Sequence, residues 1–203
     1  MQLRAENIEC QRGGRRVFEN LSFSLAPGEA LLLTGPNGSG KTSLLRLIAG
    51  LGDPASGTFE LEGVDDDLLI GQRCHYVAHK NALKSALSVE ENLRFWAQFL
   101  GAAEEADAIA RALSLFSLER LASYSASLLS QGQARRLALS RLDLVPRPIW
   151  LLDEPSVGLD KASCKILANA MQTHTANGGM LIATTHMDLG VKFSQELDMG
   201  ALA

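Results

Sequence analysis

The fold is indicated most clearly by Ala30-Leu31-Leu32-Leu33-Thr34-Gly35-Pro36-Asn37-Gly38-Ser39-Gly40-Lys41-Thr42-Ser43-Leu44-Leu45. Residues 30–34 form a short, continuous apolar run after the turn at Pro27-Gly28, as expected of a strand that is buried on both faces. The residues after Thr42 continue as an apolar helix that Gly50 can cap. The order of strand, glycine-rich loop and helix predicts an α/β protein with a mostly parallel sheet.

The loop between this strand and this helix fits the pattern G-x-x-x-x-G-K-[ST]. Its glycines let successive backbone N–H groups turn toward one anion, and the helix N-terminus adds a partial positive charge. Lys41 can reach the β and γ phosphates of a nucleotide, and the Thr42 hydroxyl can bind Mg²⁺. The predicted nucleotide-binding residues are Gly35, Pro36, Asn37, Gly38, Ser39, Gly40, Lys41, Thr42 and Ser43. By itself the loop leaves GTPases, nucleotide kinases and many ATPases open.

Hydrophobic periodicity places the remaining elements. Strands are expected at Ile149 to Leu152 and at Met180 to Thr184, with a helix from about Lys161 to Thr175 between them. Ser88-Val89-Glu90-Glu91 is a capping box, and apolar residues at helical spacing follow it: Leu93, Trp96, Ala97 and Leu100, then Ala106, Ile109, Ala110 and Leu113. We therefore expect one domain over residues 1–203, with a core lobe at about 1–86 and 146–203 and a helical subdomain at about 87–145.

Composition excludes several classes of protein. The formal charge of -4 provides no general basic field, so nucleic acid is not an expected partner. No apolar run reaches the roughly 20 residues of a membrane-spanning helix, and residues 1–6 lack the features of a secretory signal, so residence in the cytoplasm is expected. Cys10, Cys74 and Cys164 are far apart and form no C-x-x-C pair, which predicts reduced, packed thiols.

Two carboxylates follow the expected strand at residues 149–152. Asp153 and Glu154 would lie at the carboxyl edge of the sheet, where nucleotide-binding α/β proteins place charge. Asp153 is predicted to hold Mg²⁺, and Glu154 to orient the attacking water or accept its proton. In a chain without the loop at 35–42, a solvated acidic turn before Pro155 would be the better interpretation.

Leu129-Ser130-Gln131-Gly132-Gln133 opens another helix, with Ser130 as its N-cap. This helix start is a second place where backbone N–H groups can meet a phosphate. One bound nucleotide does not need two such ends from the same chain. We therefore expect the second one to face a nucleotide that is held by another copy.

The order of these elements resembles that of ABC-transporter ATPases, whose L-S-G-G-Q signature reads Leu-Ser-Gln-Gly-Gln here. Ser156-Val157-Gly158-Leu159-Asp160 resembles the D-loop of that family, with Gly158, Leu159 and Asp160 as its site residues, and His186 after Thr184-Thr185 resembles its switch histidine. The resemblance implies a P-loop NTPase core with antiparallel N-terminal strands and a helical insert. It also implies ATP and Mg²⁺, with two ATP molecules held between the phosphate-binding loops and the opposed signature residues Ser130, Gln131, Gly132 and Gln133 of a head-to-tail homodimer.

The sequence departs from the family at two positions. Most members have a glutamine where this chain has His79, at a position that touches Mg²⁺ and senses the membrane partner. An imidazole there could bind the ion weakly or only form hydrogen bonds. Where the family stacks an aromatic ring on adenine, the nearest residue is Arg12, which could stack its guanidinium or simply be solvated.

Residues 35–51, 79–95 and 128–142 resemble one branch of the family, the haem-exporter ATPases of bacterial cytochrome c maturation. This resemblance implies integral membrane transporter subunits as partners and a peripheral position on the cytoplasmic face of the inner membrane. Since the chain has no C-x-x-C-H motif, we do not expect this subunit to bind haem directly. Leu87 to Leu100 is the expected docking surface, with Arg94 and Gln98 among its exposed members.

The sequence can be compared with the requirements of four other functions. A GTPase would need an N-K-x-D-type motif, which the sequence lacks, and a nucleotide kinase would need neither the Leu-Ser-Gln-Gly-Gln segment nor the acidic pair. An ATP-binding scaffold without turnover stays open because of His79 and Arg12, whereas Lys41, Glu154 and His186 together favour turnover. The ATPase of another small ABC exporter is a further alternative.

Overall fold

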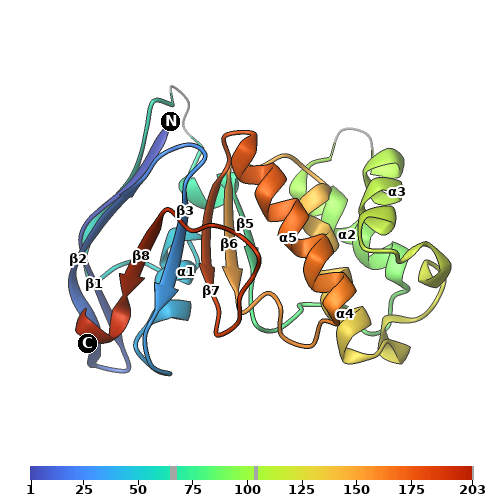
Figure 1. Ribbon diagram of the computed structural model, residues 1–203, viewed down its shortest axis with the longest axis horizontal. Helices are drawn as coiled ribbons and strands as arrows, with labels where there is room; N and C mark the ends of the chain where they lie inside the picture. The colour runs from blue at the N-terminus through green and yellow to red at the C-terminus, as the bar shows by residue number, and fades with distance from the viewer. Residues whose placement is uncertain (65–67, 103–104, 203) are drawn as a thin grey trace. The chain divides into compact units, whose positions relative to one another are not determined.

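The computed structural model describes residues 1–64, 68–102 and 105–202 of the chain (Figure 1). Its backbone forms two compact units. The first unit comprises residues 1–76, 147–154 and 171–203, and the second comprises residues 77–146 and 155–170. The predicted strand, loop and helix at residues 30–48 belong to the first unit.

The first unit contains a five-stranded sheet of order β5-β6-β7-β3-β8. Its strands are β3 (Ala30–Thr34), β5 (Cys74–Val77), β6 (Ile149–Asp153), β7 (Met180–Thr184) and β8 (Gln195–Asp198). The pairings of β3 with β7 and β8, and of β6 with β7, are parallel. Every residue of β6 and β7 is buried, which explains why their sequences are continuous apolar runs rather than alternating ones.

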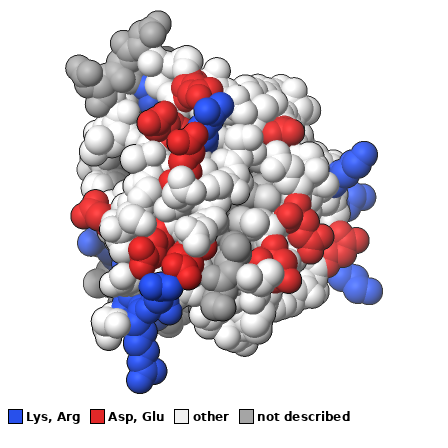
Figure 2. All heavy atoms as spheres, turned by 90° about the vertical axis from the view of Figure 1, so that its left-hand side faces the viewer, with Lys and Arg blue, Asp and Glu red and all other residues white. Residues whose placement is uncertain are grey.

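A second, antiparallel sheet of order β2-β1-β4 is built from β1 (Gln2–Arg12), β2 (Arg15–Leu25) and β4 (Ser56–Glu62). Residues of β1 alternate between buried and more exposed, so one face of this sheet enters the core. Figure 2 shows acidic and basic side chains gathered on the side of the molecule that this sheet occupies. Exposed ion pairs such as Arg16–Glu19, at 2.6 Å, join some of them and contribute little to stability.

Helix α1 (Lys41–Ile48) packs its apolar face into the core of the first unit, where Figure 1 places it between the antiparallel sheet and β6 and β7. Leu44, Leu45 and Ile48 are buried in one hydrophobic cluster with side chains of β1, β2, β3, β6 and β7. The start of α1 is therefore fixed by the packing of the helix behind it. This fixed start is the end of the phosphate-binding loop (residues 35–42).

The second unit is mainly helical. Its helices are α2 (Val89–Leu100), α3 (Glu105–Leu115) and α4 (Gln131–Ser140), and α5 (Lys161–Ala176) begins in this unit and ends in the first. Short 3-10 helices complete the chain: η1 (Ile70–Arg73), η2 (Glu119–Leu121), η3 (Ala126–Leu128), η4 (Arg141–Asp143) and η5 (Met199–Leu202).

The predicted fold class is confirmed, and the strands at 30–34 and 180–184 have the expected bounds. Two details differ from the sequence-based expectation. Ala106 and Ala110 of α3 are exposed, because the buried face of the helix is centred on Ile109 and Leu113 with Ala108 and Ala112 beside them. Strand β8 was not predicted, since its sequence Gln-Glu-Leu-Asp is mostly polar.

Among the described residues, no helix combines the length and the apolar character that crossing a membrane requires. All three cysteines carry free thiols, as predicted, and Cys10 and Cys74 are buried. Burial raises the pKa of the Cys74 thiol to about 12, which is unfavourable for a metal-binding thiolate.

Candidate functional site

The carboxyl ends of three neighbouring parallel strands meet at one edge of the sheet. Asp153 at the end of β6 is in register with Thr184 at the end of β7, and Thr184 is in register with Leu33 near the end of β3. Residues that leave these strands are therefore brought together, although the end of β3 is more than a hundred positions from the ends of β6 and β7 in the sequence. Ligands of open α/β sheets bind at such an edge.

The phosphate-binding loop runs from the end of β3 to the start of α1. Gly40 is the N-cap of α1 with a φ of 101°, and a Cβ atom there would lie 2.6 Å from the ring of Phe18. Only glycine satisfies both the backbone angle and this close approach. The loop is thus held in a turn that leads its backbone N–H groups into the helix start, the arrangement that binds phosphate.

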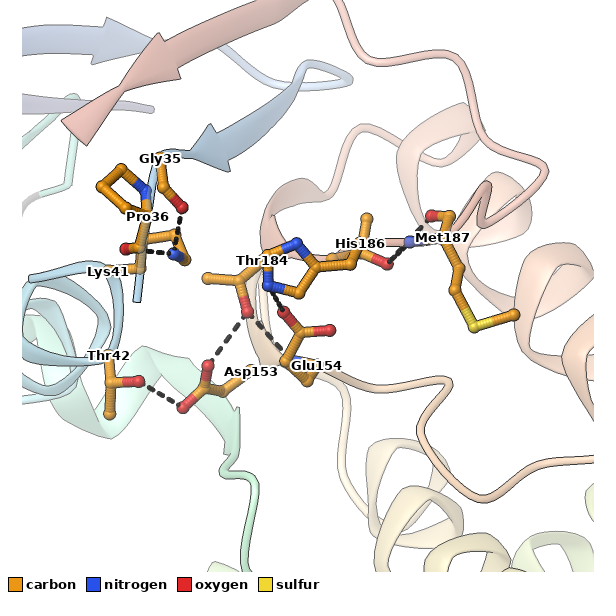
Figure 3. A network of polar contacts seen from close by, with 10 residues as sticks. Gly35, Pro36, Lys41, Thr42, Asp153, Glu154, Thr184, His186 and Met187 are labelled. Carbon is orange, nitrogen blue, oxygen red and sulfur yellow. Dashed lines mark hydrogen bonds and ion pairs between the residues drawn. The ribbon is translucent and has the colours of Figure 1, made fainter. Parts of the chain in front are cut away.

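Lys41, the first residue of α1, folds back over the loop. Its ammonium donates hydrogen bonds to the carbonyl oxygens of Gly35 and Pro36, at 2.6 and 3.0 Å (Figure 3). These bonds place a positive charge beside the loop backbone. The Lys41 ammonium therefore lies beside the loop that is predicted to bind phosphate.

A chain of hydroxyl and carboxylate groups connects the loop to the strand ends. The Thr42 hydroxyl donates to Oδ2 of Asp153 at 2.9 Å, and the Thr184 hydroxyl donates to Oδ1 of the same carboxylate, also at 2.9 Å (Figure 3). Asp153 and Thr184 are buried, whereas Thr42 is exposed. Both predicted metal-binding residues, Thr42 and Asp153, are therefore in direct contact, with their oxygen atoms turned toward each other.

The backbone of Glu154 is in an unusual conformation. Its φ of 48° lies in the left-handed region, which residues other than glycine, asparagine and aspartate rarely adopt. The Glu154 N–H donates to the Thr184 hydroxyl at 2.9 Å and to the Thr184 carbonyl at 3.2 Å, and these bonds hold the residue in place. Such strain is typical of functional positions, because the surrounding structure must maintain it.

His186 lies next to Glu154. Its Nε2 is 3.4 Å from Oε1 of Glu154, and 64% of the histidine side chain is exposed, against 18% of the glutamate side chain (Figure 3). The turn that carries His186 is fixed by Thr185, whose hydroxyl both donates to and accepts from the backbone of Met187. The two predicted catalytic residues thus lie side by side just beyond the ends of β6 and β7.

Tyr76 in β5 belongs to the surroundings of Asp153. Burial, together with the negative charge of Asp153, raises the pKa of the Tyr76 phenol to about 12. The phenol therefore stays protonated and adds no further negative charge near the carboxylate.

The signature segment (residues 129–133) lies in the second unit and starts α4. Ser130 is the N-cap: its hydroxyl accepts a hydrogen bond from the Gln133 N–H at 3.3 Å, and the Gln133 side chain accepts one from the Ser130 N–H at 2.9 Å. This capping box leaves the other N–H groups of the first turn without a partner inside the helix, which is what an anion can use. The sequence predicted the N-cap correctly.

The D-loop (residues 156–160) packs against the signature segment within the same unit. A Cβ atom on Gly132 would lie 2.8 Å from the carbonyl oxygen of Gly158, and one on Gly158 would lie 3.3 Å from Cγ of Gln131. Asp160 at the end of the loop caps α5 by accepting a hydrogen bond from the Ser163 N–H at 2.7 Å, which holds the pKa of Asp160 below its usual value. The two segments are therefore in backbone-to-backbone contact.

The two remaining predicted site residues, Arg12 and His79, are exposed. Arg12 lies at the end of β1, opposite Arg15, and His79 lies just after β5, in the second unit. Among the predicted residues, those that the structure brings together in the first unit are the phosphate-binding loop, Asp153, Glu154 and His186.

Sequence reasoning missed the role of Thr184. It treated this residue only as part of the run before His186, yet the Thr184 hydroxyl is the group that joins Asp153 to the backbone of Glu154. A hydroxyl residue at the end of a buried strand, next to a strand that ends in Asp, is the signal that could have identified it.

Known proteins resemble this chain in sequence and in structure. The sequence profile described as "ABC transporter" matches residues 18–157. The cytochrome c biogenesis ATP-binding export protein CcmA of Bradyrhizobium diazoefficiens is 52% identical over all of this chain and all of that protein.

Two solved structures have the same fold. One, described as the ATP-binding subunit of an ABC transporter, has a TM-score of 0.81 and 28% identity over 92% of this chain and 80% of its own. The other, a dimeric ATP-binding cassette in a post-hydrolysis state bound to ADP and phosphate, has a TM-score of 0.78 and 25% identity over 91% of this chain and 88% of its own. From the site geometry and these matches together, the chain belongs to the ABC transporter family, as an ATP-binding and ATP-hydrolysing subunit.

Proposed function

We propose that this ATPase subunit serves bacterial cytochrome c biogenesis as the motor of a haem exporter. Relatives described as cytochrome c biogenesis ATP-binding export proteins match the chain from end to end. Hydrogen bonds connect Thr42, Asp153, Thr184 and Glu154 in one network. This network is the main support for ATP hydrolysis by this chain, because it fixes the Asp153 carboxylate beside the phosphate-binding loop.

Residues 35–43 bind the phosphates of ATP. The backbone N–H groups of the loop and the start of α1 surround the β and γ phosphates, and the Lys41 ammonium exchanges its two loop carbonyls for phosphate oxygens. The Lys41 ammonium therefore keeps its hydrogen bonds both with and without bound ATP. Arg12 lies against the base in this proposal, and the guanidinium plane replaces the usual aromatic ring.

The pair of Thr42 and Asp153 fits a Mg²⁺ ion. One hydroxyl and one carboxylate oxygen lie 2.9 Å apart, and oxygen atoms of this kind are the ligands that Mg²⁺ prefers, with waters and phosphate oxygens as the others. When bound, the ion neutralises charge on the β and γ phosphates. A dedicated cage of three or more acidic, histidine or cysteine side chains is not needed, and none occurs among the described residues.

Glu154 and His186 carry the chemistry. The Glu154 carboxylate accepts a proton from the water that attacks the γ phosphorus, while the bond from that phosphorus to the bridging oxygen breaks and ADP leaves. His186 donates a hydrogen bond to a γ-phosphate oxygen. Its Nε2 contacts the Glu154 carboxylate and orients it toward the attacking water. Thr184 holds the backbone of Glu154, so the carboxylate is oriented before ATP arrives.

Two copies act together in this proposal. The N–H groups of the signature residues Ser130, Gln131, Gly132 and Gln133 bind the γ phosphate of the ATP that the other copy holds, and Gly158, Leu159 and Asp160 line the same interface. The dimeric cassette bound to ADP and phosphate, which shares this fold, supports the arrangement.

The partner proteins are integral membrane transporter subunits at the cytoplasmic face of the inner membrane. His79 senses the bound nucleotide and passes its state to α2. The exposed residues Arg94 and Gln98 of α2 face the partner. In this proposal the subunit handles ATP and does not itself bind haem.

Haem staining of c-type cytochromes tests the proposed role in cells. The host strain would carry, as its only copy, the wild-type protein, Glu154→Gln, or the control Glu19→Gln, which changes a carboxylate on β2 in an exposed ion pair. We expect Glu154→Gln to abolish holocytochromes while apoprotein persists, and Glu19→Gln to behave as wild type. Wild-type levels of holocytochrome with Glu154→Gln would assign the ATPase to a different transporter.

A further inference from the structure

Arg135 of α4 is a buried arginine with partners on two loops of the second unit. Only 2% of the residue is exposed. Its Nε donates to the carbonyl oxygen of Pro155 at 3.0 Å, and one terminal nitrogen donates to the carbonyl oxygen of Ala78 at 2.8 Å and to the side-chain oxygen of Asn81 at 3.1 Å. The planar guanidinium presents its donors in fixed directions, so one side chain fixes the positions of both loops.

These acceptors lie beside two residues of functional interest. Ala78 and Asn81 flank His79 in a stretch that we call the sensor segment (residues 78–81). Pro155 follows Glu154 directly in the chain. A single side chain thus connects the backbone around His79 to the first residue after the proposed catalytic base.

The chain beyond the sensor segment is also held by a buried side chain. Asn92 of α2 is only 1% exposed, and its side chain bonds to both the N–H and the carbonyl oxygen of Lys84, at 2.8 and 3.0 Å. It also donates to the carbonyl oxygen of Ser88 at 2.8 Å. The stretch from residue 78 to residue 88 is therefore fastened at its start by α4 and at its end by α2.

We infer that Arg135 is a positioning residue that couples the sensor segment to the loop beginning at Pro155. The inference rests on the proposed roles of His79 and Glu154. A buried guanidinium that loses a hydrogen-bond acceptor has no water to replace it, so displacing one loop without the other is unfavourable. Movement of the sensor segment is thus transmitted to the backbone that follows Glu154.

Arg141 provides a matched control in the same part of the chain. It is also a buried arginine, but its Nε donates to the Ala138 carbonyl oxygen and its guanidinium lies 4.3 Å from the ring centre of Trp96. These contacts stay among the helices of the second unit. A lysine in place of either arginine keeps the charge and loses the fork of donors.

The test is a double-mutant cycle on steady-state ATP hydrolysis by the full-length chain. We expect Arg135→Lys to lower kcat about ten- to a hundred-fold, as small displacements of catalytic groups do, while the Kd for ATP stays within two-fold of wild type. The loss should be less than additive with that of His79→Ala. Arg141→Lys should be additive with His79→Ala, and urea unfolding of each variant measures its loss of stability.

Asn81→Ala is the second variant, because it removes one acceptor from a partly exposed loop residue and leaves the buried arginine in place. We expect it to lower kcat several-fold without a change in the midpoint of unfolding. Additive effects of Arg135→Lys and His79→Ala, or an unchanged kcat in Asn81→Ala, would overturn the inference while leaving ATP hydrolysis by the wild type intact. A wild-type chain without ATPase activity would instead overturn the proposed function.

Discussion

At the scale of single residues, the site depends on one hydroxyl and one strained backbone. Thr184 donates to Asp153 and accepts from the N–H of Glu154, so it connects the proposed metal-binding carboxylate with the proposed base. The left-handed φ of Glu154 is kept by these bonds. The geometry of the two carboxylates is consequently set by a residue that has no role in the chemistry itself.

Replacing Thr184 by valine should therefore reduce activity more than binding. The change keeps the shape of the side chain but removes the hydroxyl, which costs about 1–3 kcal/mol of stability because buried partners are left unsatisfied. We expect kcat to fall about a hundred-fold, since Glu154 loses its orientation, with the Kd for ATP nearly unchanged. Phosphate-release kinetics and nucleotide titration measure the two effects, and Thr173→Val on the exposed side of α5 is the control. Equal kcat values for both variants would show that the hydroxyl does not position the base.

At the scale of elements, two helices begin with the same device. Ser88 with Glu91 caps α2, and Ser130 with Gln133 caps α4, each by reciprocal side-chain to backbone bonds. Only the second helix start belongs to the signature segment. Comparing the two helix starts therefore distinguishes the contribution of a capping box to stability from a contribution to phosphate binding.

Ser88→Ala and Ser130→Ala should each lower the free energy of unfolding by about 1 kcal/mol, the usual contribution of an N-cap. Only Ser130→Ala should also reduce ATP hydrolysis, because it removes a hydroxyl from the segment that meets the γ phosphate. Urea unfolding and ATPase assays on the two variants check this. A similar loss of activity in both would mean that Ser130 acts through stability alone.

Much of the fold follows from sequence because local signals agree with the packing. The strands at 30–34 and 180–184 were predictable from continuous apolar runs, the capping box of α2 from Ser88 with Glu91 three residues later, and the N-cap of α4 from Ser130. Strand β8 carries no such signal, since its place depends on backbone pairing with β3 at the edge of the sheet.

The contacts within the site were harder to predict than its residue types. The close approach of Gly132 to Gly158 and the bonds of Arg135 to two loops arise from tertiary packing, which no local pattern records. Asp153 and Glu154, by contrast, were identified from their place at the end of an apolar strand. The residue types of the site could be predicted from the sequence, whereas the contacts that each residue makes could be seen only in the folded structure.

At the scale of the whole molecule, the partly buried His174 links stability to pH. The His174 ring stacks on Trp150 with ring centres 4.1 Å apart, and its Nε2 lies 3.1 Å from the Met180 carbonyl oxygen. Burial lowers the pKa of His174 below its ordinary value of 6.5. In the unfolded chain the ring regains its ordinary pKa, so the unfolded state binds a proton at a higher pH than the folded state does.

Stability should consequently fall as pH drops below 6.5, and it should be unaffected by this group at higher pH. The loss cannot exceed about 1.4 kcal/mol per pH unit for one proton. Urea unfolding at pH 7.5 and pH 5.5 measures it, and His174→Phe, which keeps a ring against Trp150, should show a smaller loss. An identical pH dependence in wild type and variant would assign the effect to other groups.

Dimerisation is the other property of the whole molecule. Glu154→Gln leaves the phosphate-binding loop and the signature segment intact, so ATP should remain bound and hold two copies together. Sedimentation of the variant in excess Mg-ATP should show a dimer, and sedimentation with ADP should show a monomer. A variant that stays monomeric with Mg-ATP would contradict the proposed arrangement of two opposed sites.

Phosphate release from Mg-ATP by the purified wild-type chain and by Glu154→Gln shows whether Glu154 is the catalytic base. If Glu154 is the base held by Thr184 at the end of β6, the variant should lose about a hundred- to ten-thousand-fold in kcat, the usual contribution of general base catalysis, and still bind ATP. A variant that hydrolyses ATP at the wild-type rate would show that the chemistry occurs without this carboxylate.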